Sequence, residues 1–331
     1  MLNQYNPFKD NRTEQMRDLW KYYVPFPGVD GSAKPLVVEG GRGSGKTMFF
    51  QCNSWRQILL QLRKNGKTTR TLLNEHDFIG IYYRVDTTFV ASMCNREETS
   101  WNAIFETYLS ICILQELLDF IIAVSDDMNI DGDVLSQFVS DFSKRFNINS
   151  EVDSLRAFRR ETDLYLDIIE NKINGLEKDT NFNLRWVNAY RIIRDMCIAC
   201  NALFQEELLF KVFIDEYETL QEYQQKIINT LIKHSTIPVI FNIGLRPQGM
   251  KTHETISATE TIEAPHDYEP LTLGIEDIQH YPEILKEICK KRIILGKEFG
   301  KIPASAPEEI EFYLGTYSLD YELEKITRSS K

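Results

Sequence analysis

The residues with the clearest chemical potential form a glycine-rich run. It reads Gly40-Gly41-Arg42-Gly43-Ser44-Gly45-Lys46-Thr47 and matches GxxxxGK[ST] at every position. The apolar stretch LVVEG (36–40) precedes it, and a helical pattern runs from Thr47 to about Lys64. Glycines let successive backbone N–H groups point at phosphate oxygens, and a helix N-terminus adds partial positive charge. The run therefore predicts a nucleotide-binding loop that includes all eight residues, whereas a chance glycine turn would not require this context.

Two residues of the loop have individual predicted roles. Lys46 is expected to reach the β- and γ-phosphates and to act in catalysis, and the Thr47 hydroxyl is expected to ligate Mg²⁺. The absence of an NKxD-type guanine motif favours ATP over GTP, and the absence of an LSGGQ-like stretch disfavours an ABC-type ATPase. The predicted cofactors are therefore ATP and Mg²⁺.

A second apolar segment ends in two acids. In LLFKVFIDE (208–216), Asp215 is expected to hold Mg²⁺ through water, and Glu216 to orient and polarise the attacking water as a general base. The alternative is an exposed acidic turn after a strand. The interval between Lys46 and Asp215 exceeds the minimal spacing of such domains, which a helical insertion explains.

The next strand, within STIPVIFNIG (235–244), supplies two further candidates. We expect Asn242 to lie at the tip of this strand and to sense the γ-phosphate, with turn capping as the alternative. Arg246 is predicted to contact phosphate, within its own subunit or across a subunit interface. The alternative for Arg246 is a surface arginine before a turn induced by proline.

These residues require a parallel sheet to position them. Apolar strand patterns alternate with helical patterns, which predicts a parallel sheet covered on both faces. The fold class is α/β, a P-loop NTPase sheet flanked by helices, with a helical insertion and a helical C-terminal portion. The expected strands are 36–40, 78–87, 207–216, 235–244 and 267–274, and the expected helices of the insertion are 100–124, 131–146, 150–173 and 184–205. The predicted domains are a lead-in (1–35), an ATPase domain (36–274) with an insertion at about 100–206, and a C-terminal helical lid (275–331).

Composition narrows the class of protein. The net charge of −11 argues against a chain that mainly wraps nucleic acid, because such binding depends on Lys and Arg. The pair Cys197 and Cys200 falls in a helical pattern, so core packing is favoured over a metal site. The apolar stretch 104–124 carries three acids, which predicts a buried helix rather than a membrane span. With no signal peptide pattern at the N-terminus, we expect a cytoplasmic protein that does not enter a membrane.

Three segments in order, VVEGGRGSGKT, FIDEYETLQEYQQKIINTLIK and VIFNIGLRPQG, resemble the origin-recognition-complex-like AAA+ ATPases, in particular their bacterial branch. The lead-in NPFKDNRTEQMRDLW is similar to the N-terminal box of that group, which implies that Arg12 and Glu14 border the nucleotide. The phrase GLRPQG also resembles the STAND NTPases. Bacterial members of both groups are common in anti-phage defence, so the resemblance implies that context.

The chain departs from the family pattern in two places. A sensor-two arginine is expected in the lid; Arg292 is the nearest option, and we expect it on a solvated helix face. The residues after Arg292 are too few for the winged-helix DNA-binding domain of the relatives, so the chain is either a fragment or a pared-down relative.

The leading hypothesis is an ATP-dependent molecular switch or assembly ATPase with slow hydrolysis. It would pass its nucleotide state to a protein partner through the helical insertion, and a homo-oligomer is expected. One alternative is a DNA-loading ATPase of the origin type, which the net charge disfavours. Another is a STAND-like scaffold that holds ATP with little turnover.

Overall fold

The computed structural model describes residues 16, 18–26, 33–93, 98–125, 127–128, 130–148, 152, 154–174, 185–274 and 281–314. The predicted nucleotide neighbours Arg12 and Glu14 lie outside these residues. The chain divides into two compact units. The larger is Pro27–Glu276, and the smaller combines Met1–Phe26 with Asp277–Lys331.

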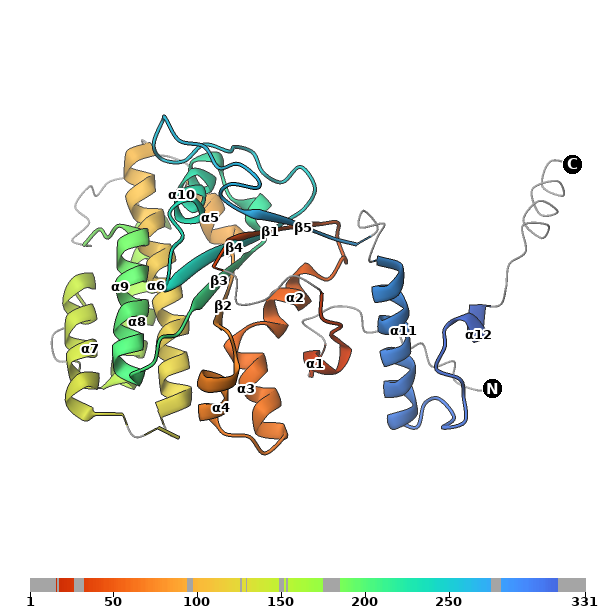
Figure 1. Ribbon diagram of the computed structural model, residues 1–331. Coiled ribbons are helices and arrows are strands. Elements are labelled where there is room, and N and C mark those ends of the chain that lie inside the picture. The colour runs from red at the N-terminus through yellow and green to blue at the C-terminus, as the bar shows by residue number, and fades with distance from the viewer. Residues whose placement is uncertain are drawn as a thin grey trace, which may run out of the picture. The chain divides into compact units, whose positions relative to one another are not determined.

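The larger unit is built on a five-stranded sheet in the order β2-β3-β4-β1-β5, in which every pairing is parallel (Figure 1). Its strands are β1 (Leu36–Gly40), β2 (Ile79–Arg84), β3 (Phe210–Asp215), β4 (Val239–Leu245) and β5 (Glu269–Leu273). Strand β4 lies between β1 and β3, so the strand that leads into the glycine-rich loop and the strand that ends in Asp215 are not neighbours. The predicted α/β fold class is confirmed.

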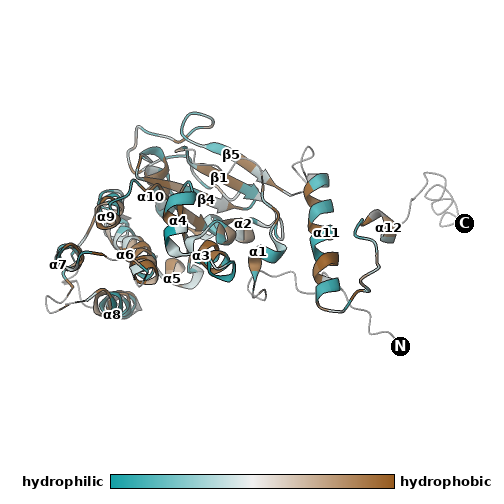
Figure 2. Ribbon diagram, turned by 60° about the horizontal axis from the view of Figure 1, so that its bottom comes forward, coloured by the Kyte–Doolittle hydropathy of each residue, from teal (hydrophilic) through white to brown (hydrophobic). Residues whose placement is uncertain are grey.

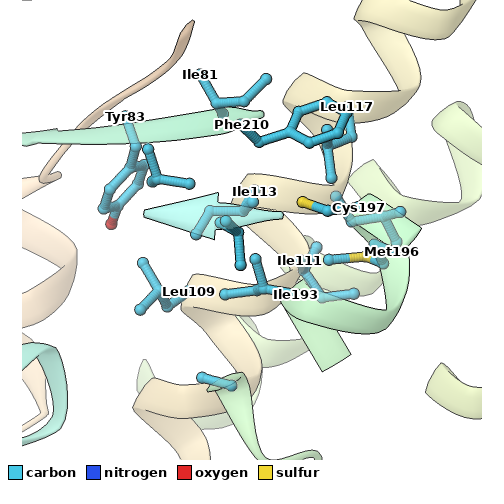
Figure 3. Close-up of a cluster of buried hydrophobic side chains, with 14 of the residues drawn as sticks. Ile81, Tyr83, Leu109, Ile111, Ile113, Leu117, Ile193, Met196, Cys197 and Phe210 are labelled. Atoms are coloured by element: carbon cyan, nitrogen blue, oxygen red, sulfur yellow. The ribbon is translucent and has the colours of Figure 1, made fainter. Parts of the chain in front are cut away.

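Burial explains why these strands read as continuous apolar runs. Every residue of β3 and β4 is buried, as expected for a parallel sheet covered on both faces. On one face, Phe213 stacks on Phe50 of helix α2 (Lys46–Cys52), with ring centroids 5.1 Å apart. On the other, Phe210 lies in an apolar cluster with residues of two long helices (Figure 3). Because side chains alternate along a strand, Asp215 emerges on the same face as Phe213.

The helix predicted from Thr47 to about Lys64 is broken in two. Helix α2 ends at Cys52, and α3 (Trp55–Lys64) begins after Ser54, whose backbone is extended. The Ser54 hydroxyl donates to the carbonyl of Gln51 at 2.6 Å, a local bond that competes with the helical ladder. A Cβ on Gly80 of β2 would lie 2.0 Å from the Asn53 carbonyl oxygen, so the break packs directly on the sheet. Helix α4 (Thr69–Glu75) follows.

The predicted helical stretches between β2 and β3 are confirmed. They form α6 (Glu98–Ser125), α7 (Gly132–Phe146), α8 (Leu155–Asn174) and α9 (Ala189–Phe204), preceded by α5 (Thr87–Ser92) and complemented after β3 by α10 (Glu222–Lys233). Helix α6 contacts β2, α8, α9 and α10. In Figure 3, Ile111 and Leu117 of α6 lie near Met196 and Cys197 of α9. Both Cys197 and Cys200 are fully buried, as core packing predicts.

Helix α6 alone is long and apolar enough, within the described residues, to span a membrane by length and composition. Most of that apolar segment, 67% of it, is buried inside the fold, as in the core helix of a globular unit. Its acids are also used internally: Glu106 accepts from the Ala189 amide at 2.7 Å, and Glu116 pairs with Arg56 at 3.0 Å. In Figure 2 the neighbouring helices α7, α8 and α9 carry both hydrophobic and hydrophilic residues.

The smaller unit contains α1 (Leu19–Tyr22), α11 (Tyr281–Glu298) and α12 (Glu311–Leu314). Arg292 of α11 is only 8% exposed, and its guanidinium lies 4.4 Å from the ring centroid of Tyr22. The expectation of a solvated helix face at Arg292 is therefore wrong, because a cation–π contact covers the side chain. The predicted division into 1–35, 36–274 and 275–331 stays a prediction.

Candidate functional site

The glycine-rich loop joins β1, which ends at Gly40, to α2, which begins at Lys46. Gly43 and Gly45 have φ values of 84° and 98°, a left-handed backbone that L side chains rarely adopt. A Cβ on Gly40 would lie 2.4 Å from Ser44 Oγ and 2.5 Å from the Leu273 carbonyl oxygen. Ser44 Oγ is itself buried and has no hydrogen-bond partner among the described residues. This cradle, with an orphaned donor inside it, fits a phosphate group.

The ammonium group of Lys46 lies over this loop. Its Nζ donates to the carbonyls of Gly40 at 2.5 Å and Gly41 at 3.1 Å. Burial lowers the pKa of Lys46, and the nearby carboxylates of Glu218, Asp215 and Glu216 act in the opposite direction. The lysine is therefore a partly desolvated cation beside the phosphate cradle.

Thr47 and Asp215 form the oxygen-rich part of the site. The Thr47 hydroxyl donates to Asp215 Oδ2 at 2.8 Å, and the Tyr82 hydroxyl donates to the same atom at 3.1 Å. Asp215 is 2% exposed; burial raises its pKa, whereas the hydrogen bonds from Thr47 and Tyr82 lower it. A hydroxyl and a carboxylate side by side are ligands of the kind that Mg²⁺ prefers, so these residues fit that ion.

Glu216 follows at the end of the same strand, in a left-handed conformation with φ of 64°. Its amide donates to Asp215 Oδ1 at 3.0 Å. Its carboxylate lies between two arginines, with Oε1 3.4 Å from Arg84 and Oε2 3.8 Å from Arg246. The carboxylate predicted to be the general base is thus paired with cations from β2 and from the turn after β4.

Arg246 is brought into this group, as the phosphate-contact hypothesis requires. Its Nε lies 2.9 Å from Glu218 Oε1, in addition to the contact with Glu216. Its side chain is still 53% exposed, so the guanidinium is held by carboxylates but not enclosed. Arg42, by contrast, is exposed on the loop. The predicted roles of both arginines stay predictions.

The predicted position of Asn242 is wrong. Strand β4 continues to Leu245, and Asn242 lies in its middle with no exposed surface. Its Oδ1 accepts from the Leu36 amide at 2.9 Å, and its Nδ2 donates to the Val212 carbonyl at 3.2 Å. Because Ile243 is in register with Val37, Asn242 is level with the first residue of β1, roughly 13 Å from the loop at about 3.3 Å per residue. The side chain joins strands and does not reach the phosphate cradle.

Sequence reasoning missed three residues of the site. Tyr82 and Arg84 belong to β2, and Arg84 is in register with Asp215. Glu218 belongs to the short 3-10 turn Tyr217–Thr219 after β3. The polar ending of IYYR and the last glutamate of DEYE were the available signals, but they acquire meaning only once β2 is known to lie beside β3.

Comparison with known families agrees with this geometry. A family model described as ORC-CDC6-like matches residues 6–331. No match was found among curated proteins or among solved structures. The matched range includes all but the first five residues of the two units and every element of the site described above. With its P-loop NTPase fold, the chain belongs to the ORC-CDC6-like family, a group of AAA+ ATPases.

Proposed function

We propose that the protein binds ATP with Mg²⁺ in the cytoplasm, hydrolyses it slowly and acts as a molecular switch or assembly ATPase. The observation that carries this proposal is the convergence of Lys46, Thr47, Asp215 and Glu216 at the carboxyl edge of one parallel sheet. Ligands of such sheets bind outside the carboxyl ends of the strands.

Each residue has a role that its surroundings support. The loop amides and Lys46 would bind the phosphates, and Thr47 and Asp215 would hold Mg²⁺, which neutralises developing phosphate charge when bound. Glu216 would accept the proton of the attacking water. In the structure Arg84 and Arg246 lie 3.4 and 3.8 Å from its carboxylate oxygens, on the group that would have to hold the attacking water. This crowding of the carboxylate supports the proposal of slow turnover.

A chain of ion pairs supports transmission of the nucleotide state to the helical layer. Helix α3 follows α2 directly, and its Arg56 pairs with Glu116 at 3.0 Å and Asp119 at 2.6 Å of α6. Arg159 of α8 pairs with the other oxygen of Asp119 at 3.0 Å. A shift of α2 on nucleotide binding would therefore be transmitted through α3 to two helices of the layer, α6 and α8. We infer that this layer presents the nucleotide state to a protein partner.

Two substitutions and one control test the central proposal. Lys46→Ala should weaken ATP binding by more than about tenfold, because a phosphate contact is lost. Glu216→Gln should retain ATP but reduce phosphate release by about 10²-fold or more. Lys67→Ala removes an exposed lysine that pairs with Glu75 and should change neither measurement. A wild-type protein that binds no ATP, or a Lys46→Ala variant with unchanged binding and turnover, would refute the proposal.

The same assays separate the scaffold alternative from an ATPase. If wild-type protein and Glu216→Gln retain ATP equally over time, the site holds nucleotide without turnover. If gel shifts instead show duplex binding that weakens steeply with salt, the DNA-loading alternative gains support.

We further propose a homo-oligomer and a role in bacterial anti-phage defence, on the basis of the family and the STAND-like GLRPQG segment. Sedimentation and pull-down experiments with and without ATP test these points. An unchanged monomer that captures no partner in either state would contradict them.

A further inference from the structure

Glu218 is an acid of the site that the roles above leave unused. It lies one short turn beyond Glu216, and the Thr219 hydroxyl fastens that turn by donating to the Glu216 carbonyl at 2.7 Å. The Glu218 side chain is only 13% exposed. Its Oε1 pairs with Arg246 Nε at 2.9 Å, while its Oε2 is buried and has no hydrogen-bond partner among the described residues.

Glu218 is also the strongest anionic neighbour of Lys46. Its charge opposes the burial that lowers the pKa of the lysine more than the charges of Asp215 and Glu216 do. Burial in turn raises the pKa of Glu218, against the influence of Arg246 and Lys46. The Glu218 carboxylate therefore faces both Lys46 and Arg246, the two cations that are predicted to contact phosphate.

The backbone around this pair is fixed on both sides. A Cβ on Gly249 would lie 2.6 Å from Glu218 Cβ and 2.8 Å from the Arg246 carbonyl oxygen, so only glycine allows the turn after β4 to close on Glu218. Gln225 ties the two segments together, because its Nε2 donates to the carbonyls of Tyr217 at 3.3 Å and Gly249 at 3.0 Å. With Glu218 enclosed and Arg246 half exposed, the cation is the partner that can move.

We propose that Glu218 is a positioning residue that retains Arg246 before ATP binds and that the γ-phosphate of ATP must draw this arginine away from it. The inference rests on the proposed function, since it concerns the same nucleotide. Glu218 thus competes with the γ-phosphate for one guanidinium. ADP has no γ-phosphate and would leave the Glu218–Arg246 pair in place, so the pair distinguishes the two nucleotides.

The test is a double-mutant cycle on equilibrium binding of fluorescent ATP and ADP analogues in the presence of Mg²⁺. The proteins are the wild type, Glu218→Gln, Arg246→Gln and the double variant, with Glu75→Gln as a control at an exposed ion pair. Glu218→Gln should bind the ATP analogue about fivefold tighter, as expected for release of a half-exposed ion pair, with a smaller change for ADP. In the Arg246→Gln background, Glu218→Gln should no longer change the ratio of ATP to ADP affinity.

A merely structural role for Glu218 predicts a different pattern. It would shift both affinities together, and the shift would persist without Arg246, which would overturn the inference. Glu218→Asp retracts the carboxylate by one methylene and should change ATP binding in the same direction by less, so it serves as a second variant if Glu218→Gln folds poorly. If the wild type binds ATP in a Lys46-dependent way but both Glu218 variants bind ATP and ADP with wild-type affinities, this inference alone is overturned. A wild type that binds no nucleotide overturns the proposed function with it.

Discussion

Replacing Asn242 with alanine should destabilise the sheet and leave the nucleotide site intact. The side chain is fully buried and serves three backbone groups, namely the Leu36 amide and the carbonyls of Val212 and Ile240. It therefore links β4 to both of its neighbours, β1 and β3. A γ-phosphate sensor would have no reason to be placed in this position.

The expected cost follows from those contacts. A buried amide left without an acceptor costs about 1–3 kcal/mol, and loss of the two longer bonds adds about 1 kcal/mol. The Leu36 residue is only 5% exposed, so water cannot easily replace the lost acceptor. A total of about 2–4 kcal/mol, divided by a urea slope of about 3 kcal/mol/M, lowers the unfolding midpoint by about 1 M.

The assay combines urea unfolding with ATP-analogue binding. Asn242→Ala should show the lower midpoint and, under native conditions, an ATP affinity within about twofold of the wild type, because the site is distant. Asn74→Ala, at an exposed position of α4, is the matched control and should change the midpoint little. An Asn242→Ala protein with the wild-type midpoint but weakened ATP binding or lost turnover would refute this reasoning and restore the sensor role.

Two further substitutions test local features. The Asp86 carboxylate caps α5 by accepting from the amides of Thr88 and Phe89, so Asp86→Ala should cost about 1 kcal/mol in urea unfolding at pH 7. Hydrogen bonding holds the pKa of Asp86 below its usual value. The stability that the cap contributes is therefore complete above the unfolded pKa of about 3.9 and is lost as the pH falls through the lower folded pKa. The stability difference between wild type and Asp86→Ala should shrink in acid, and a difference that grew would contradict the capping role. Gly244→Ala places a Cβ 2.4 Å from the Phe50 ring and should lower thermal stability by about 1–3 kcal/mol in calorimetry, whereas an unchanged melting temperature would contradict this close packing.

Local patterns were sufficient to predict the loop and the strands that surround it. The glycine run carries its own backbone requirement, visible in the positive φ values of Gly43 and Gly45. Buried parallel strands are largely apolar, so β3 and β4 were recognisable from their residues alone. The helices α7, α8 and α9 were predicted because each repeats apolar residues at helical spacing, and α6 because its apolar run is too long for a strand.

The error at Asn242 arose because strand ends and register depend on neighbouring strands. When the start of β4 is not known, the polar residue in FNIG can mark either the end of the strand or its middle. In the structure β4 starts only at Val239 and runs to Leu245, and Asn242 faces the start of β1. A buried amide that satisfies strands on both sides cannot be distinguished from a sensor by its identity alone.

The strand order also explains how the charges of the site are arranged. Glu216 follows β3 directly, and the two neighbouring strands supply one cation each, Arg84 from the end of β2 and Arg246 from the turn after β4. Both arginines act on the same carboxylate, and Arg246 is also paired with Glu218. A γ-phosphate that attracts Arg246 would remove the contact of Glu216 with Arg246 at 3.8 Å and leave its contact with Arg84 at 3.4 Å. ATP binding would thereby remove one of two cations from the carboxylate proposed as the general base, so recognition of the γ-phosphate and access of water to Glu216 would depend on the same side chain.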